Sequence, residues 1–205
     1  MPVAKRNRSV KAMKKKAVFL DRDGTINIEK NYLVRFEDWE FIDGAVEAIK
    51  GLQKLGFLVV VVTNQAGIAR GFYKSSDVER LHNTVNALLK ERGCCIDAFY
   101  FCPHHPDISA KCDCRKPAPG MILRAADELG IDLSHSYMVG DKIIDVLAGI
   151  HAGVCPIMVK TGYGMQEETD LKKMDIEVPV TSVDDIFAAY QFIKKEALRK
   201  QMEGD

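Results

Sequence analysis

The sequence predicts an α/β protein, a three-layer α/β/α sandwich around a parallel, Rossmann-like sheet. Two observations predict this fold. Short continuous apolar runs, clearest at 17–20 and 57–62, are typical of strands that a parallel sheet buries on both faces. Between such runs lie stretches with apolar residues at helical spacing, and right-handed crossover connections place these helices on both faces of the sheet.

Five segments fit buried strands. They are 17–20, 57–62, 96–101, 137–139 and 154–159. The second is the strongest, because it ends in four consecutive β-branched residues. A glycine-containing turn at 161–164 follows the last of them. Strands in this succession, each followed by a turn or a helix, predict a sheet with its ligand crevice at the carboxyl ends of the strands.

The first two predicted helices have clear start and stop signals. One opens after Asp43 and ends at Gly56, since glycine commonly terminates helices. The next starts at Ser76, where Glu79 three residues later predicts a capping box, and ends at Gly93.

Three further helices complete the alternation. The third begins near Pro119, which suits the first helical turn, and closes at Gly130. The fourth follows Asp145, and the last is expected to be capped by Ser182 with Asp185. No second hydrophobic core is evident, so we expect only a minimal cap made of loops.

The length and net charge of the chain limit the number of domains and the kinds of partner that we expect. A chain of 205 residues fits one domain, which we place at 17–205, after a disordered basic tail at 1–16. That tail would more often be solvated than serve as a nucleic-acid arm. The formal charge is zero, no apolar run approaches the ~20 residues of a spanning helix, and no signal core precedes the first strand. We therefore expect a monomeric cytoplasmic protein without a nucleic-acid or membrane partner.

Polar groups follow four of the predicted strands. Asp21 and Asp23 end the first, and Thr63 with Asn64 ends the second. The third leads through a cysteine-rich loop to Arg115 and Lys116, and the fourth ends in Asp141 with Asp145 four residues on. Because parallel strands end at one edge, these acids, cations and hydroxyl should converge. Such a set is typical of a site for a phosphoryl group and Mg²⁺.

The cysteine-rich loop predicts a second metal site. Cys102-x-His104 and Cys112-x-Cys114 form a Cys₃His set, which is typical of structural, tetrahedral Zn²⁺. A disulfide is the alternative, and His105 is the alternative imidazole. The other cysteines and histidines are interpreted as packing residues. They are Cys94, Cys95, Cys155, His82, His135 and His151.

The strand-end motifs together resemble the haloacid dehalogenase superfamily of phosphohydrolases. They are DRDGT at 21–25, TN at 63–64, KP at 116–117 and GD at 140–141 with Asp145. The loop TNQAGIARG at 63–71, the zinc-type loop and GDK at 140–142 are similar to the D-glycero-D-manno-heptose 1,7-bisphosphate 7-phosphatase family. That resemblance implies removal of the 7-phosphate of a small sugar bisphosphate, in nucleotide-heptose synthesis for lipopolysaccharide or surface glycans. A histidinol-phosphate phosphatase, or another small sugar-phosphate phosphatase of the superfamily, is the alternative.

The resemblance also implies residue roles. Asp21 would be the nucleophile, and Asp23 would protonate the leaving oxygen and later activate water. Asp21, the backbone carbonyl of Asp23, and Asp141 would bind Mg²⁺. Thr63 and Lys116 would hold the transferring phosphoryl group. Substrate binding is expected from Glu29, Lys30, Asn31, Tyr32, Thr63, Asn64, Gln65, Ala66, Arg115, Lys116 and Lys142.

Within those sets, some residues have narrower expected roles. Arg115 suits a second phosphate or the sugar, because its planar fork fits such groups. Lys142 is expected to contact phosphate or Asp21, and Asp145 to orient the metal site without binding the metal. Whether Asp145 or His105 contacts a metal stays open at this point.

Two functions from other classes fit less well. A receiver-type signalling domain is also a parallel α/β fold, but there the acid pair precedes a phosphorylated residue on a later strand. A zinc-based nucleic-acid module is disfavoured by the neutral charge and the acid-rich sheet edge.

Overall fold

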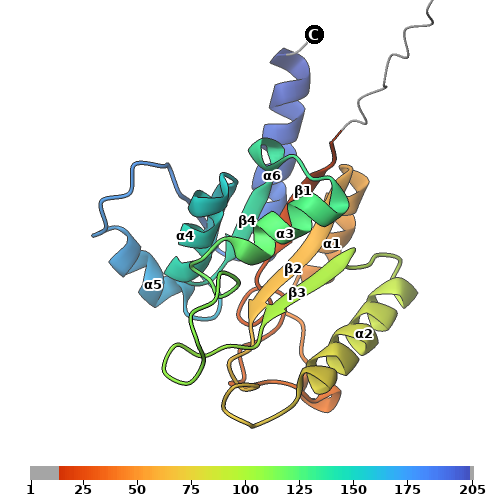
Figure 1. Cartoon of the computed structure of the whole chain (residues 1–205). Coiled ribbons are helices and arrows are strands. Elements are labelled where there is room, and N and C mark those ends of the chain that lie inside the picture. Colours follow the sequence, from red (N-terminus) through yellow and green to blue (C-terminus); the bar gives the residue numbers. More distant parts are fainter. Residues whose placement is uncertain (1–13, 204–205) are drawn as a thin grey trace, which may run out of the picture.

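The structure, a computed structural model, describes residues 14–203 (Figure 1). Its strands form one sheet in the order β3-β2-β1-β4-β5-β6, and each neighbouring pair is parallel. The strands are β1 (Lys16–Leu20), β2 (Phe57–Asn64), β3 (Ala98–Cys102), β4 (Tyr137–Gly140), β5 (Cys155–Val159) and β6 (Thr181–Val183). The predicted Rossmann-like sheet is confirmed.

Helices cover both faces of this sheet, which gives the predicted three layers. α1 (Ala45–Lys54), α2 (Ser75–Glu91) and α6 (Ile186–Glu203) contribute to the core on one face. α3 (Gly120–Leu129) and α4 (Ile143–Ala152) cover the other, with α5 (Gly164–Leu171) packed beside α4. In Figure 1, α3 crosses in front of the sheet and α1 lies behind it. Two short 3-10 turns, Phe36–Asp38 and Leu133–His135, complete the described elements.

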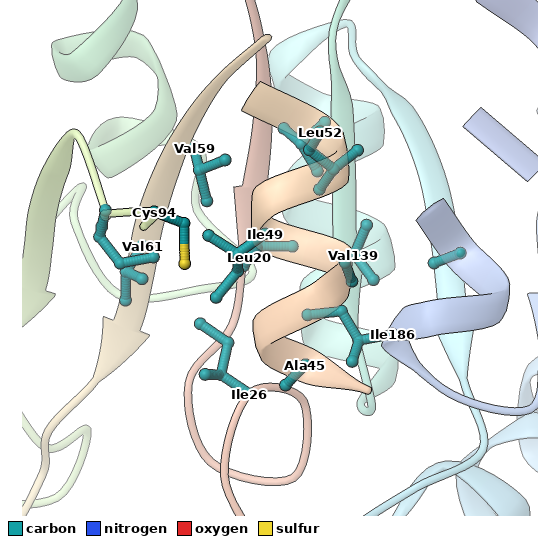
Figure 2. Packing of buried hydrophobic residues seen from close by; sticks show 14 of the residues in the cluster. Leu20, Ile26, Ala45, Ile49, Leu52, Val59, Val61, Cys94, Val139 and Ile186 are labelled. Atoms are coloured by element: carbon teal, nitrogen blue, oxygen red, sulfur yellow. The ribbon is translucent and has the colours of Figure 1, made fainter. Parts of the chain in front are cut away.

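Successive side chains of a strand point to opposite faces of the sheet, so there is one hydrophobic core on each face. In β1, Val18 and Leu20 face α1, whereas Ala17 and Phe19 face α3 and α4. Figure 2 shows the first of these cores, where Leu20 packs against Ile49 of α1. Each buried side chain of this kind removes apolar surface from water and stabilises the fold by about 1.5–3 kcal/mol. Burial on both faces explains why the strands appear in the sequence as continuous apolar runs.

Two of the predicted helix caps need correction. The segment around Ser182 forms a sixth strand, and Asp185 alone caps α6, accepting from the Ala188 backbone N–H at 2.8 Å. At α2, the carboxylate that caps the helix is that of Asp77, which accepts from the Lys74 N–H at 2.9 Å. The expected pair of Ser76 and Glu79 is wrong, because the helix begins one residue earlier and Lys74 is the extended N-cap.

The boundary of the predicted tail also moves. Lys15 donates its backbone N–H to the Gly130 carbonyl at 2.9 Å, and Lys16 is the first residue of β1. The Lys16 ammonium lies 4.2 Å from the centre of the Phe57 ring on the neighbouring strand β2, so contact with the sheet orders this charged residue. The rest of the predicted tail, residues 1–13, lies outside the described residues.

The strand order positions the site. From β1 the chain adds β2 and β3 on one side of the sheet. It then returns to place β4 on the other side of β1, so the switch point of the strand order lies between β1 and β4. In open parallel sheets, ligands bind at the carboxyl end of such a switch point. Among residues 14–203, no helix combines the length and apolar content needed to cross a bilayer.

Candidate active site

A cavity of about 310 Å³ opens at the carboxyl ends of β1, β2 and β4. Its lining contains most of the residues expected at the site: Asp21, Asp23, Glu29, Asn31, Tyr32, Thr63, Asn64, Gln65, Ala66, Lys116 and Lys142. It also contains Tyr73, Ile144, Tyr163 and Glu167, which the sequence analysis did not single out. Two expected residues, Lys30 and Arg115, do not line it, and Asp141 lies fully buried beside it.

Three buried carboxylates meet next to this cavity. Asp21, Asp141 and Asp145 each offer an oxygen within 4.8 Å of the others. Burial, together with the charges of the neighbouring carboxylates, raises the pKa of Asp141 to about 8. Burial raises the pKa of Asp145 to about 6, although Lys116 opposes that change. Burial and mutual repulsion therefore make it unfavourable for all three carboxyl groups to be ionised at once in the protein alone.

Lys116 is the cation inside this group. Its ammonium lies 2.8 Å from Asp21 Oδ1 and 2.6 Å from Asp145 Oδ1, and it donates to the Val62 carbonyl at 2.8 Å. Asn64 fixes the Lys116 backbone from both sides, accepting its N–H and donating to its C=O, each at 3.1 Å. Since Asp145 also accepts the Lys142 N–H, both of its oxygens have partners. Asp145 therefore contacts both the Lys116 ammonium and the Lys142 backbone.

Asp141 leaves one oxygen free. Its Oδ2 accepts the Tyr163 N–H at 2.9 Å, but its Oδ1 is buried without a hydrogen-bond partner in the described part of the chain. Gly24 permits this arrangement, because a Cβ there would lie 2.3 Å from Oδ2 and its φ is +83°. Thr161 ties the two segments together by donating to the Gly24 carbonyl at 2.6 Å. A buried, unpaired carboxylate oxygen is a natural ligand for a cation.

Asp23 is held by donors on several sides. Arg22 contacts both carboxylate oxygens, and Asn27 donates to Oδ1 at 3.0 Å. Gln65 donates to Oδ2 at 3.2 Å and to the Thr63 hydroxyl oxygen at 3.0 Å. Burial by itself would raise the pKa of Asp23, but Arg22, Asn27 and Gln65 outweigh burial and lower it. The carboxylate is fixed in direction beside the cavity.

The Thr63 hydroxyl is aimed by its neighbours. Its oxygen accepts from the Gln65 amide, so its own hydrogen remains available to a ligand. Tyr73 donates its hydroxyl to Gln65 Oε1 at 2.8 Å and thereby turns the amide nitrogen toward Thr63 and Asp23. Tyr73 belongs to the loop between β2 and α2, two residues beyond the 63–71 motif that the sequence analysis singled out.

The loop after β1 reaches across the mouth of the cavity. Glu29 lies 3.4 Å from the Lys142 ammonium, and the ring of Tyr32 packs edge-on against Phe72, with centroids 4.8 Å apart. Asn31 and Tyr32 both have positive φ, at 49° and 56°. Lys30, expected to bind substrate, instead pairs with Glu40 at 3.0 Å.

The cysteine-rich loop brings its four expected ligands together. Cys102 Sγ lies 3.5 Å from His104 Nδ1, 3.7 Å from Cys112 Sγ and 3.2 Å from Cys114 Sγ. Ligands in a tetrahedron of ~2.3 Å metal–sulfur bonds are separated by about 3.8 Å, so the spacing is close to that of a zinc site. None of these sulfurs is at disulfide distance, and the described cysteines are all free.

His105 is occupied elsewhere. Its Nε2 lies 2.7 Å from an Arg70 nitrogen, and its Nδ1 accepts the Asp107 N–H at 3.2 Å. The four side chains of this loop that come close enough together to hold a metal are Cys102, His104, Cys112 and Cys114, and His105 is not among them. Cys155, His135 and His151 were expected to pack in the core but are exposed, whereas His82 is buried, at 3% exposure.

Arg115 faces a neighbouring hollow. Its Nη1 donates to the His104 carbonyl at 3.0 Å, which ties it to the cysteine-rich loop. It lines a second cavity of about 460 Å³, next to Lys111, His105 and Lys116. Because Lys116 lines both cavities, the two hollows adjoin at that residue.

Comparisons with known proteins agree with this geometry. A family model described as HAD-hydrolase-like matches residues 113–187. The D-glycero-β-D-manno-heptose-1,7-bisphosphate 7-phosphatase of Pasteurella multocida is 46% identical over 75% of this chain and 86% of its own. The protein of the same name from Photorhabdus laumondii is 42% identical over 87% of this chain and 97% of its own.

Solved structures point the same way. The crystal structure of D,D-heptose 1,7-bisphosphate phosphatase from B. bronchiseptica, complexed with magnesium and phosphate, is 32% identical, with a TM-score of 0.80. The match covers 88% of this chain and 99% of that one. Sequence identity, fold and the convergence of acids with Lys116 thus agree. The chain belongs to the family of the D-glycero-β-D-manno-heptose-1,7-bisphosphate 7-phosphatases among the HAD-like hydrolases, and it is a phosphatase.

Proposed function

We propose that this phosphatase removes the 7-phosphate of D-glycero-D-manno-heptose 1,7-bisphosphate, in the synthesis of nucleotide-activated heptose. The observation that carries the proposal is the 46% identity to a relative of that name, joined to a cavity in which Asp21, Asp23, Thr63 and Lys116 converge. Two adjoining hollows also suit a substrate with two phosphates. The first holds the reacting groups, and the second presents Arg115 and Lys111.

We further propose Mg²⁺ as the metal of the acid cluster, bound by Asp21, the Asp23 backbone carbonyl and Asp141. The donors fit, since Mg²⁺ prefers oxygen ligands and Asp141 has a buried oxygen with no other partner. The charge fits as well, because three carboxylates lie together and only two of them, Asp21 and Asp145, pair with Lys116. When bound, Mg²⁺ would screen these charges and polarise the phosphoryl oxygens.

The first step of the proposed mechanism belongs to Asp21. Its carboxylate attacks the phosphorus in line, forming an aspartyl phosphate while the bond to the sugar oxygen breaks. The Thr63 hydroxyl and the Lys116 ammonium stabilise the negative charge on the transferring group. Asp23 supplies a proton to the departing sugar oxygen, so the sugar leaves as a neutral alcohol.

The second step reverses the role of Asp23. Its carboxylate takes a proton from water as the water oxygen attacks the phosphorus of the aspartyl phosphate. Inorganic phosphate leaves, and Asp21 returns as a carboxylate. Over both steps water is consumed and neither aspartate is changed.

We propose a structural Zn²⁺ for Cys102, His104, Cys112 and Cys114. The ligand set is closed, with four protein donors and no place for a substrate. The loop it would hold leads directly to Arg115 and Lys116. Gly120, at the start of α3, seats the loop by donating its N–H to the Asp113 carbonyl at 2.9 Å.

A substrate panel tests the function. The wild type is assayed for phosphate release from both anomers of heptose 1,7-bisphosphate, heptose 7-phosphate and histidinol phosphate, and ³¹P NMR identifies which phosphate is lost. We expect the highest kcat/KM for a heptose bisphosphate, with the 1-phosphate retained in the product. Preference for histidinol phosphate, or loss of the 1-phosphate, would contradict the proposal.

A further inference from the structure

Arg22 separates the two catalytic aspartates in sequence, and its side chain is almost wholly buried, at 1% exposure. Its guanidinium lies against the carboxylate of its own neighbour, Asp23. The Nε atom donates to Oδ1 and Oδ2 at 3.2 and 3.1 Å, and Nη2 donates to Oδ1 at 2.9 Å. Arg22 therefore spans both oxygens of Asp23, whereas Asn27 and Gln65 each contact one.

The far side of the guanidinium is also occupied. Nη2 donates to the Leu33 carbonyl at 2.8 Å, and Nη1 lies 3.4 Å from His82 Nε2 on α2. His82 stacks on Phe99, with ring centroids 4.4 Å apart, which fixes the plane of its imidazole. Burial and the adjacent Arg22 lower the pKa of His82 to about 3, so the ring is neutral and its Nε2 accepts.

These contacts join three separate parts of the chain. Arg22 links the carboxylate beside the cavity to the loop that carries Asn31 and Tyr32 and, through His82, to helix α2. A guanidinium with donors in a fixed plane can hold a carboxylate in one orientation.

We propose that Arg22, supported by His82, is a positioning residue that aims the Asp23 carboxyl group, protonated for this step, at the leaving oxygen of the substrate. The inference rests on the role of Asp23 in the proposed function. Protonation of the leaving oxygen requires Asp23 to sit within hydrogen-bond reach of it, and small errors in position cost much of the rate. Arg22 does not touch substrate and acts only through Asp23.

A purely structural role for Arg22 predicts something different. If the buried cation only stabilised the fold, its loss would slow all substrates alike. If it aims a proton donor, the loss depends on the leaving group. An alkoxide needs the proton as the bond to phosphorus breaks, whereas p-nitrophenolate departs readily without it. The comparison of an alkyl with an aryl phosphate therefore separates the two roles.

The experiment measures kcat/KM of wild type and Arg22→Lys on heptose bisphosphate and on p-nitrophenyl phosphate. This parameter reports steps up to the first phosphoryl transfer, so the later hydrolysis of the aspartyl phosphate does not enter. Lysine keeps the charge but cannot span both oxygens of Asp23. We expect a loss of at least about tenfold on the sugar phosphate and of less than about threefold on the aryl phosphate, since positioned acids contribute ~10²–10⁴-fold.

His82 supplies a second pair of variants, which remains informative if Arg22→Lys does not fold. His82→Gln keeps an acceptor for Arg22, whereas His82→Leu leaves a buried guanidinium donor unpaired. We expect the leaving-group-dependent loss in His82→Leu and a smaller one in His82→Gln. Arg80→Lys and His135→Gln change exposed residues with partners outside the site and serve as controls.

Equal losses on both substrates, or no loss on either, would overturn the positioning role. The substrate assignment fails separately, because it is judged on the wild type alone. Should the wild type ignore heptose bisphosphate, the same ratio is measured with whichever alkyl phosphate it hydrolyses.

Discussion

At the scale of single residues, the site depends on carboxylates that are costly to hold together. Asp21 lies 2.8 Å from Lys116, and the oxygens of Asp141 and Asp145 are within 4.8 Å. A buried like-charge group of this kind is retained where its chemistry is needed. Two predictions at this scale concern Asp21, the proposed nucleophile, and His82, which lies outside the group of carboxylates.

Asp21→Asn is expected to abolish phosphate release and to leave the fold intact. An amide is nearly the same size as the carboxylate but cannot attack phosphorus to form an acyl phosphate. Turnover and circular dichroism of the purified variant are the measurements. Substantial residual turnover, free of contaminating phosphatase, would assign the nucleophile to another residue.

His82→Gln is expected to make the free energy of unfolding less dependent on pH below about pH 6.5. The folded-state pKa of His82, about 3, lies below the unfolded value of roughly 6.5, so the unfolded chain binds more protons. The contribution of the neutral ring is complete above pH 6.5 and is lost as the pH falls toward 3, by on the order of 2 kcal/mol at pH 4.5. Urea unfolding between pH 7 and 4 measures it.

The two proteins are predicted to differ most at pH 7, where the variant lacks the ring stacked on Phe99, and less at pH 4.5. His135→Gln is the control, since His135 is exposed. Parallel stability curves for wild type and His82→Gln would contradict the buried neutral state of His82.

The sequence analysis identified the site residues that lie at or after strand ends. It missed the residues whose role depends on contacts with distant parts of the chain. Thr63 lies at the end of β2, Asp141 directly follows β4, and Lys116 follows β3 through the cysteine-rich loop, and the carboxyl ends of parallel strands lie at one edge of a sheet. Arg22 sits between two aspartates with no pattern of its own, and its partner His82 is 60 positions away on a helix. Nothing local distinguishes such a histidine from one that only packs.

At the scale of elements, the loop between β3 and α3 carries the most function. It begins at Cys102, the last residue of edge strand β3, and returns with Arg115 and Lys116 to the β2 end through Asn64. Asn64 therefore fixes the part of this loop that carries Lys116.

Cys112→Ser is expected to lose the zinc, about one ion per chain in the wild type, and to lower both substrate affinity and turnover. Arg115 and Lys116 directly follow Cys114, so their aim depends on the loop. The sheet should persist, because its two cores are formed by strands and helices. Elemental analysis, kinetics and circular dichroism are the measurements.

Cys155→Ser is the matched control, because Cys155 is exposed and outside the cluster. Zinc-free protein with normal kinetics would show that the loop needs no metal. Zinc held elsewhere, with the four residues free, would contradict the assignment of the site.

Sequence patterns predicted the elements with a clear apolar pattern and missed β6 and α5. β6 has three half-buried residues, too few to form an apolar run, and α5 has only a weak apolar stripe. β2 extends to Asn64 because Asn64 pairs with Cys102 of β3, which a single segment cannot reveal. The local spacing of apolar residues does not predict a strand boundary that is set by pairing with a distant strand.

At the scale of the whole molecule, the acid cluster should couple metal binding to stability. A cation that binds only the folded chain stabilises it by about 2.7 kcal/mol at a hundredfold excess over Kd, or several degrees in Tm. We expect Mg²⁺ to raise Tm, and chelation to abolish an activity that Mg²⁺ restores and Ca²⁺ does not, because Ca²⁺ favours higher and looser coordination. Thermal unfolding and phosphate release measure both effects.

Asp141→Asn gives the matching variant. It removes one of three crowded carboxylates, so we expect a higher Tm than the wild type without metal and little response to Mg²⁺. Asp175→Asn, on an exposed segment, is the control. A wild-type Tm that ignores Mg²⁺, or full activity with Ca²⁺ alone, would contradict the magnesium assignment.

The pairing of β1 with β4 has a consequence for the protein while it is being made. Asp21 leaves the ribosome early, but Asp141 follows only after more than half of the chain has been added. The four residues proposed to bind zinc, at 102–114, emerge between them. A nascent chain can therefore assemble its cysteine-rich loop before it possesses a complete catalytic centre, and it cannot hydrolyse sugar phosphates until β4 has inserted beside β1.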